Sequence, residues 1–217
     1  MFTGIIQAVG EVRRLEPRGG DQRLYIAPGK LDMAGVAIGD SIAVNGVCLT
    51  AVELDGALFA ADVSRETLSL TTLGDLGPGR AVNLEKALTL ATPLGGHLVS
   101  GHVDGVGTLR ERREEARAWR LRIAAPGELA RYIAPKGSIC VDGTSLTVNR
   151  VDGAEFELMI VPHTLQETIT AEYRVGTRVN LEVDLIARYL ERLLLGERAA
   201  EGGGVTEELL ARHGFVK

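Results

Sequence analysis

Aromatic residues are scarce in this chain and make up 4% of its 217 residues. A folded core must therefore consist mainly of Val, Leu, Ile and Ala side chains. Cysteine is scarcer still, since the two thiols, Cys48 and Cys140, are too few for a disulfide framework in a chain of this length. The remaining composition, with 45% apolar and 24% charged residues, is ordinary for a soluble globular protein and excludes a disordered or fibrous chain.

The chain also lacks an excess of positive charge and a long hydrophobic run. Lys and Arg number 24 against 29 Asp and Glu, which disfavours nucleic acid and anionic membranes as partners. The longest stretch free of these four residue types, 87–103, is broken by Pro93 and several glycines and is too short to span a bilayer. Residues 1–14 have no positive segment ahead of an apolar one, so no signal peptide is expected. We expect a cytoplasmic protein.

Motifs for nucleotide phosphates and for metal ions are missing as well. No P-loop and no GxGxxG pattern occurs, so a phosphate cradle is not indicated. His97 and His102 lie five residues apart in a Gly-rich stretch, without Cys or carboxylate companions at ligand spacing, and no metal site is expected. Residues 75–86 have the character of ordinary surface.

A shift of 97 residues aligns two copies of one unit. Residues 2–88 then fall on residues 99–185 without a gap, with roughly 28 identical pairs over about 87 positions, where chance gives on the order of five or six. The segment VNGVCLT at 44–50 falls on VDGTSLT at 141–147, and VNLE at 82–85 recurs unchanged in the second copy. The chain therefore contains an internal duplication.

Each copy has the short apolar segments and turn residues of an all-β domain. In the first copy these segments are 4–12, 24–27, 41–44, 49–54, 58–63 and 81–84. Asp55-Gly56 and its counterpart Asp152-Gly153 suit hairpin turns, because both residue types tolerate positive φ. Five or six short strands in under 90 residues favour a small closed barrel, which has no exposed edge, and a β-sandwich is the alternative. We predict one barrel over residues 1–97 and a second over 98–184.

Residues 185–217 have a different pattern, which indicates a helix beginning near Leu185. Its apolar face would carry Ile186, Tyr189 or Leu190, Leu193 and Leu194. An apolar stripe outside both barrels needs a surface to bury it, either its own barrel or copies of itself, and we favour oligomerisation. Three glycines at 202–204 are expected to form a flexible link to a second short helix over 206–212, with Thr206 as its N-cap.

Positions at which the two copies differ chemically are candidates for function, since a duplicated fold needs the same structural residues in both halves. The informative pairs are Cys48 and Ser145, Ile5 and His102, Gly39 and Lys136, and Glu66 and His163. Each also has a structural interpretation, with Cys48 as a small buried apolar residue, Ser145 as a turn or strand hydroxyl and Glu66 as a solvated or capping residue. Two similar pockets with different reactive side chains would suit two similar ligands in different roles.

The opening MFTGII, together with motifs in both copies, resembles the riboflavin synthase family of the α-chain type. These motifs are NGVCLT at 45–50, SRETLSLTTLG at 64–74, GGHLVSGHVDG at 95–105, KGSICVDGTSLT at 136–147, VPHTLQETI at 161–169, GTRVNLEVD at 176–184 and ARYLERLL at 187–194. The resemblance covers about residues 1–195 and implies two six-stranded Greek-key β-barrels in tandem and a C-terminal α-helix that holds a homotrimer.

The resemblance also implies a reaction, the dismutation of two molecules of 6,7-dimethyl-8-ribityllumazine. One molecule gives a four-carbon unit to the other, which yields riboflavin and 5-amino-6-ribitylamino-pyrimidinedione, with no metal and no redox cofactor. Family sites form between the N-terminal barrel of one subunit and the C-terminal barrel of its neighbour. Association with lumazine synthase is a further partner that the sequence leaves open.

Candidate residues follow from the same resemblance. The candidate catalytic residues are Cys48, Ser145, His102, His97, Thr147, Glu66 and Asp184. The candidate substrate-binding residues are Phe2, Gly4, Ile5, Ile6, Cys48, Leu49, Thr50, Asp62, Val63, Ser64, Arg65, Glu66, Thr67, Gly101, His102, Val103, Lys136, Ser145, Leu146, Thr147, Val161, Pro162, His163, Thr164, Leu165 and Gln166. In this interpretation His102 is the base or proton shuttle. Cys48 and Ser145 would add to the acceptor ring or position a water molecule.

Two other functions compete with this one. A non-catalytic lumazine- or flavin-binding fluorescent protein would share the duplicated fold but typically loses polar residues from one half-site, whereas both copies keep theirs here. A flavin-binding barrel of a reductase would need a partner nucleotide domain, for which the chain has no room.

Overall fold

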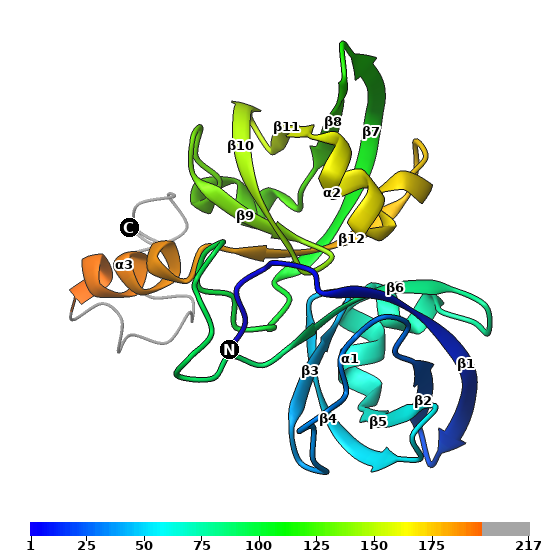
Figure 1. The fold of residues 1–217 in the computed structure, drawn as a ribbon. Helices are drawn as coiled ribbons and strands as arrows, with labels where there is room; N and C mark the ends of the chain where they lie inside the picture. The colour runs from blue at the N-terminus through cyan, green and yellow to red at the C-terminus, as the bar shows by residue number, and fades with distance from the viewer. Residues whose placement is uncertain (197–217) are drawn as a thin grey trace. The chain divides into compact units, whose positions relative to one another are not determined.

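The first repeat folds into a closed six-stranded barrel, shown by the computed structural model, which describes residues 1–196 (Figure 1). Its strands are β1 (Ala8–Arg18), β2 (Asp21–Ala27), β3 (Ser41–Val44), β4 (Val47–Leu54), β5 (Phe59–Val63) and β6 (Ala81–Lys86). They pair antiparallel around the barrel in the order β1-β2-β5-β4-β3-β6, which is a Greek-key connection. Full closure excludes the β-sandwich alternative.

The second repeat folds into a barrel with the same strand order. Its strands are β7 (Gly105–Glu115), β8 (Ala118–Ala124), β9 (Ser138–Val141), β10 (Thr144–Asp152), β11 (Glu155–Ile160) and β12 (Arg178–Val183). The 97-residue shift maps the bounds of β1, β2, β3 and β6 onto those of β7, β8, β9 and β12 without adjustment. The predicted all-β fold with two six-stranded Greek-key barrels is confirmed.

A short helix and a 3-10 helix follow the fifth strand in both repeats. They are α1 (Arg65–Leu70) and η1 (Thr72–Asp75) in the first repeat, and α2 (Pro162–Glu167) and η3 (Ile169–Glu172) in the second. The second repeat has a further 3-10 helix, η2 (Gly127–Tyr132), between β8 and β9. Ser64 begins α1 by accepting a hydrogen bond from the Thr67 N–H. Each of these helices is a turn or two long, too short for a period of 3.6 to stand out among the flanking strands.

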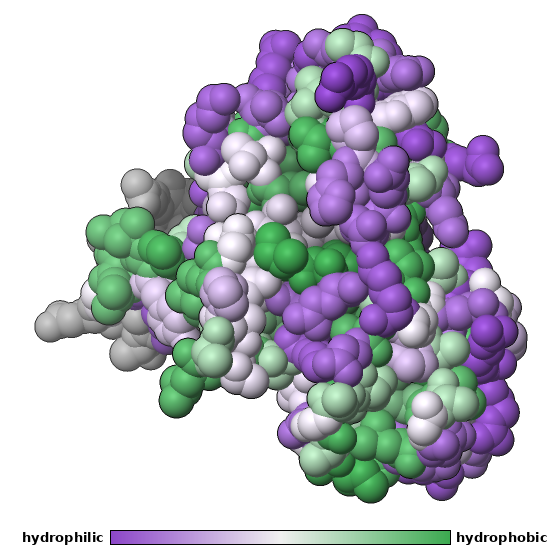
Figure 2. Space-filling model, in the orientation of Figure 1, coloured by the Kyte–Doolittle hydropathy of each residue, from purple (hydrophilic) through white to green (hydrophobic). Residues whose placement is uncertain are grey.

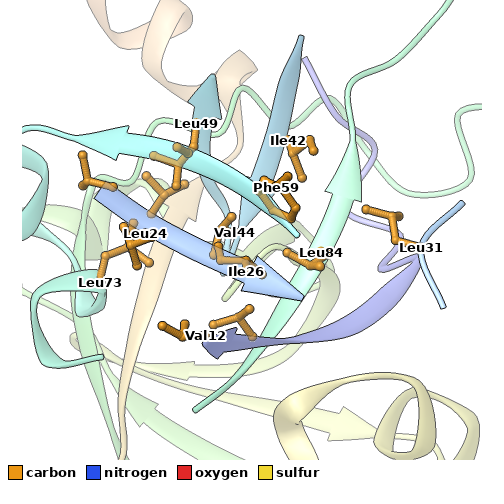
Figure 3. Close-up of a cluster of buried hydrophobic side chains, with 14 of the residues drawn as sticks. Val12, Leu24, Ile26, Leu31, Ile42, Val44, Leu49, Phe59, Leu73 and Leu84 are labelled. Atoms are coloured by element: carbon orange, nitrogen blue, oxygen red, sulfur yellow. The ribbon is translucent and has the colours of Figure 1, made fainter. Parts of the chain in front are cut away.

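The inward side chains of alternate strand positions fill each barrel. In the first barrel Leu24 and Ile26 of β2 point into the same cluster as Ile42 and Val44 of β3, with Phe59 of β5 among them (Figure 3). Their period of two is the pattern of a strand with one buried face. The second barrel has an equivalent cluster around Phe156, the counterpart of Phe59. Aliphatic residues thus supply most of both cores.

The first strand begins later than the sequence predicts. We expected a strand over 4–12, whereas β1 begins at Ala8 and continues as a twisted hairpin with β2 to Arg18. Residues 2–6 lie outside the barrel because they contact the other repeat. The apolar residues Ile5 and Ile6 thus belong to the junction between the barrels rather than to a strand.

The two barrels meet around a pseudo-twofold axis at which equivalent residues pair. Phe2 and Val99 form an antiparallel bridge, with N–H···O distances of 2.7 and 3.1 Å. Gly46 and Gly143 lie in equivalent turns at φ +77° and +83°. A Cβ on either glycine would lie 2.7 or 2.9 Å from the backbone nitrogen of the other. Both turns therefore require glycine for its backbone freedom and for its small size.

Two buried asparagines, Asn83 and Asn180, join the barrels by reciprocal hydrogen bonds. The Asn83 Nδ2 donates to the carbonyl of Asp142, and the Asn180 Nδ2 donates to the carbonyl of Asn45, both at 2.8 Å. Each Oδ1 accepts a backbone N–H from the 3-10 helix of the opposite repeat. Since both side chains are 1% exposed, this paired network fixes how the barrels of one chain meet.

The surface character predicted for residues 75–86 is wrong. Within this range Asn83 and Glu85 are 1% and 2% exposed, and four consecutive residues of β6 are buried. Their polar side chains face the junction between the barrels instead of solvent. The identical VNLE in both repeats reflects this shared position.

One side of the junction carries a buried carboxyl group. Asp142 stands where the first repeat has Asn45; its Oδ1 accepts from the Asn180 N–H at 2.7 Å and its Oδ2 from the Tyr173 hydroxyl at 2.5 Å. Burial raises the pKa of Asp142 to about 7, although both hydrogen bonds act in the opposite direction. The second repeat thus holds a titratable group at a place where the first repeat holds a neutral amide.

The described C-terminal residues form α3 (Leu185–Leu195), the predicted helix. Residues Met1–Leu185 form one compact unit, and the described residues 186–196 belong to a second. Five side chains of α3 are more than half exposed: Ile186, Tyr189, Leu190, Leu193 and Leu194. Figure 2 shows green, hydrophobic surface over this helix. The short helix predicted over 206–212 lies outside the described residues. Over residues 1–196, none of the helices has the length and apolar character required to cross a membrane.

Asp142→Asn should remove part of the pH dependence of stability. The folded state binds the Asp142 proton more tightly than the unfolded state, so the free energy of unfolding of the wild type falls as pH rises from about 4 to 7, by at most about 1.4 kcal/mol per pH unit from this group. The substituted chain copies the Asn of the first repeat and should lose this contribution. Urea denaturation at several pH values measures both slopes, and equal slopes would contradict the assignment.

Candidate functional site

The two repeats exchange short segments across their junction. We call residues 2–6 the first strap and residues 99–103 the second strap. The first strap reaches the second barrel, where the Ser145 N–H donates to the Gly4 carbonyl at 2.7 Å. The second strap reaches the first barrel, where the Cys48 N–H donates to the Gly101 carbonyl at 2.8 Å. Each candidate reactive residue therefore lies beside a strap from the other repeat.

Glycine is required at the point where each strap crosses. Gly4 and Gly101 have φ of +74° and +81°. A Cβ on Gly4 would lie 2.6 Å from the Ser145 Cβ, and one on Gly101 would lie 2.7 Å from the Cys48 Cβ. The backbone of each strap therefore lies so close to the side chain of the opposite barrel that only glycine fits at the crossing point.

The first candidate half-site comprises Cys48, the predicted residues of the second strap that contacts it, and those of the segment from the end of β5 into α1. Cys48 is half-buried on β4, followed by buried Leu49 and exposed Thr50. The strap adds Gly101, His102 and Val103, of which His102 is exposed. Asp62, Val63, Ser64, Arg65, Glu66 and Thr67 follow one another from the end of β5 into α1.

Two predicted residues of this half-site have particular surroundings. Asp62 accepts two hydrogen bonds from the Arg23 guanidinium, at 2.6 and 2.8 Å, and these bonds lower the pKa of Asp62 below its usual value. Glu66 is exposed in the first turn of α1. Glu66 is the counterpart of His163, so the two half-sites present a carboxylate and an imidazole at equivalent positions.

The second half-site is built in the same way around Ser145. Ser145 and Leu146 are half-buried on β10, and Thr147 beside them is exposed. The first strap contributes Gly4, exposed Ile5 and half-buried Ile6. The remaining predicted residues are Val161, Pro162, His163, Thr164, Leu165 and Gln166, which begin and form α2.

His97 and Ser145 form a side-chain pair in the second half-site. The His97 Nδ1 lies 2.7 Å from the Ser145 Oγ, and the His97 N–H donates to the carbonyl of Thr3 in the first strap at 3.1 Å. Burial lowers the pKa of His97, while the charge of Asp184 acts in the opposite direction. A neutral imidazole in contact with a hydroxyl is suited to accept its proton.

Lys136 occupies a strained backbone position. Its φ is +69°, and its counterpart in the first repeat is Gly39 at φ +99°. The two turns have the same hydrogen bonds, from the Gly39 N–H to the Ala51 carbonyl and from the Lys136 N–H to the Val148 carbonyl. Glycine would satisfy this backbone at lower cost, so the exposed ammonium group of Lys136 is a candidate for function.

Glu85 and Glu182 are missing from the sequence-based candidates, although both hold a strap. They are 2% and 4% exposed, and burial raises the pKa of each. The repeated VNLE was a visible signal, because an identical polar residue persists in both copies. The strand pattern alone could not show that this face is buried against a strap. Over residues 1–196, no group of three or more His, Cys, Asp or Glu side chains is arranged to hold a metal ion.

Comparison with known protein families places both repeats in one domain type. Residues 3–87 and residues 100–184 each match the lumazine binding domain. These two stretches contain both half-sites almost entirely, with Phe2 and His97 just outside them. The match supports the duplication on grounds independent of the internal shift.

Curated relatives match the chain along its length. A riboflavin synthase of Photobacterium phosphoreum is 49% identical over 217 residues, which is 100% of both chains. A riboflavin synthase of Mycobacterium tuberculosis is 49% identical over 199 residues, covering 89% of this chain and 98% of the relative. That of Bacillus subtilis is 38% identical over 218 residues, covering 99% and 100%.

Solved structures of LumP resemble the fold. LumP complexed with riboflavin superposes with a TM-score of 0.78 at 26% identity, covering 84% of this chain and 99% of LumP. LumP complexed with 6,7-dimethyl-8-(1'-D-ribityl) lumazine gives a TM-score of 0.76 over the same shares. LumP thus binds both compounds.

Gly101→Ala should destabilise the chain more than Gly56→Ala does. Both glycines have positive φ, +81° and +84°, so both substitutions incur the backbone cost of about 1–2 kcal/mol. Gly56 has open space around its Cβ position, whereas Gly101 has the Cys48 Cβ at 2.7 Å. Urea denaturation should therefore show a further loss of about 1–3 kcal/mol for Gly101→Ala alone. Equal losses would show that the strap does not approach Cys48 as described.

Proposed function

The chain belongs to the riboflavin synthase family, and we propose that it catalyses the dismutation of two molecules of 6,7-dimethyl-8-ribityllumazine. A four-carbon unit passes from one molecule to the other, giving one riboflavin and one 5-amino-6-ribitylamino-pyrimidinedione. The products together contain all atoms of the two substrates, so the reaction consumes no oxidant and no other reactant. The sequence-based prediction of this family is confirmed by the full-length relatives, and with it the enzyme class.

The observation that carries the proposal is that the two half-sites share the same backbone arrangement but have different reactive side chains. Equivalent strands and exchanged straps surround Cys48 in one and Ser145 in the other. Two copies of one substrate would fit two such surfaces. The differing side chains would let one copy act as donor and the other as acceptor.

We assign the first proton transfer to a histidine. The methyl group at position 7 of the lumazine is acidic because its carbanion is delocalised into the ring, so a base within hydrogen-bond reach suffices to remove a proton. His102 is exposed on the second strap, where its side chain is accessible to a bound ring. Its imidazole can accept this proton and return it later.

We assign activation of a nucleophile to the second half-site. The Ser145 hydroxyl is in contact with the Nδ1 of His97, whose lowered pKa keeps the imidazole neutral at pH 7. His97 can accept the hydroxyl proton as Ser145, or a water molecule held by it, adds to the acceptor ring. Cys48 is the matching nucleophile candidate in the first half-site, and Asp184 would orient His97.

The ribityl chain needs several hydrogen-bonding partners, and both half-sites offer them. In the first, Ser64 and Thr67 lie at the start of α1, and in the second, His163 and Thr164 lie in the first turn of α2. Lys136 would contact a carbonyl or an anionic ring. Binding both substrates together makes an intermolecular attack effectively intramolecular, which is potentially the largest contribution to the rate.

The predicted assembly is a homotrimer, in which the first half-site of one chain and the second half-site of its neighbour would form one complete site. The exposed apolar side chains of α3 support self-association. Cytoplasmic location and association with lumazine synthase remain predictions.

A non-catalytic lumazine- or flavin-binding protein is the alternative, and the fold shared with LumP favours it. The His97–Ser145 pair argues against it, since a ligand-binding site has no need of a neutral imidazole placed on a hydroxyl. Turnover distinguishes the two functions.

The purified chain, incubated with 6,7-dimethyl-8-ribityllumazine alone, should form one riboflavin for every two lumazines consumed. Absorbance and fluorescence follow both compounds. Tight binding with unchanged lumazine would contradict the proposed function and support the binding protein.

Ser145→Ala should lower kcat by about 100-fold or more, because proton transfer through a positioned side chain contributes about 10²–10⁴-fold. The matched control is Asn149→Ala, an exposed residue of the same strand, which should keep the wild-type rate. A Ser145→Ala rate within threefold of wild type would remove Ser145 from the reaction.

A further inference from the structure

Two buried glutamates hold the straps by the same set of hydrogen bonds. Glu182 Oε1 accepts from the N–H and the hydroxyl of Ser100, at 2.6 and 2.7 Å, and its Oε2 accepts from the Gly101 N–H at 2.9 Å. The Ser100 hydroxyl in turn accepts from the His102 N–H at 3.3 Å. One carboxylate therefore fixes three consecutive residues of the second strap.

Glu85 repeats this arrangement on the first strap. Its Oε1 accepts from the N–H and the hydroxyl of Thr3, at 2.7 and 2.6 Å, and its Oε2 accepts from the Gly4 N–H at 3.0 Å. The Thr3 hydroxyl accepts from the Ile5 N–H at 3.1 Å. Each donor and acceptor around Glu85 lies 97 residues before its counterpart around Glu182.

Each glutamate holds the strap of its own repeat, yet that strap completes the half-site of the other. Glu182 lies on β12 of the second barrel, whereas the strap it holds accepts the Cys48 N–H in the first barrel. Glu85 lies on β6 of the first barrel, whereas its strap accepts the Ser145 N–H in the second. A change at either carboxylate should therefore alter the half-site of the opposite barrel.

These carboxylates are costly to bury, which argues for a specific role. Both lie almost entirely out of solvent, and three hydrogen bonds to the charged form offset only part of the desolvation. An apolar residue would fill the same space in a strand core without leaving a charge to compensate. It would not, however, hold two successive backbone N–H groups of a strap in one orientation.

We infer that Glu182 and Glu85 are positioning residues for the reaction, each setting the reactive groups of the half-site in the opposite barrel. Glu182 orients His102 and, through the Gly101 carbonyl, Cys48. Glu85 orients Ile5, Ser145 and, through the Thr3 carbonyl, His97. The inference rests on the proposed function for the roles of these groups, but the contacts themselves do not depend on it.

The test compares Glu182→Gln with Glu85→Gln, which are each other's control. A glutamine amide has one acceptor oxygen and would face the Gly101 or Gly4 N–H with an NH₂ group, so that one strap bond is lost while the volume is kept. The chain has four histidines, and three of them report on the half-sites: His102 on the first, and His97 and His163 on the second. Heteronuclear NMR of ¹⁵N-histidine-labelled chain, with and without riboflavin, reads the two half-sites separately.

Glu182→Gln should shift the His102 signals and abolish their response to riboflavin, while His163 keeps its response. Glu85→Gln should shift His97 and alter the His163 response, while His102 keeps its own. In the lumazine assay both variants should lose at least about tenfold in kcat, the size expected for a small displacement of a reacting group. Where a glutamine variant does not fold, Ser100→Ala or Thr3→Val removes one bond of the same strap and takes its place.

Equal changes at both half-sites, or none at either, would overturn the inference, because a merely structural carboxylate would not act selectively across the junction. The proposed function is judged separately by the wild-type chain. Failure of the wild type to form riboflavin contradicts the function, whereas normal turnover with unaltered half-sites in both variants contradicts only the positioning role.

Discussion

The structure depends on a constraint at the junction between the barrels: each repeat sends a strap to the candidate reactive residue of the other. Each strap leaves its repeat at a glycine that has no room for a side chain and bonds to the backbone of the reactive residue in the other barrel. The buried asparagines fix the barrels around the same axis. The way the two barrels meet therefore determines where each strap lies against the opposite barrel.

Duplication explains how one fold can present two related ligands to one another. The shared residues, among them the glycines of the turns and the paired asparagines and glutamates, keep the frame the same in both repeats. The reactive positions differ, with Cys48 and Ser145 on equivalent strands and His102 and Ile5 on equivalent straps. A symmetric frame with unequal groups suits a reaction in which identical substrates must take different roles.

Much of the fold could be predicted from the sequence, because the 97-residue shift, the turn glycines and the period of the strands are local signals. The strand bounds of the first repeat follow its apolar segments closely, with the first strand as the exception. Ile5 and Ile6 look like strand residues, and only the tertiary structure shows that they cross to the other barrel. For the same reason the sequence predicts residues 75–86 as surface, because a polar strand face that is buried against a strap has the same pattern as a solvated one. Cys48, Ser145 and His102 can be singled out as positions at which the two copies differ, and the family resemblance supplies their roles. Glu85 and Glu182 leave only the repeated VNLE as a sequence signal, and their contacts show what they hold.

The decisive experiment is a crystal structure of the chain with bound riboflavin. We expect one riboflavin against Cys48 and the second strap, and another against Ser145 and the first strap. Each ring should contact backbone of the strap that comes from the opposite repeat. Riboflavin at only one of these places, or at neither, would contradict the view that exchanged straps build two ligand-binding half-sites in each chain.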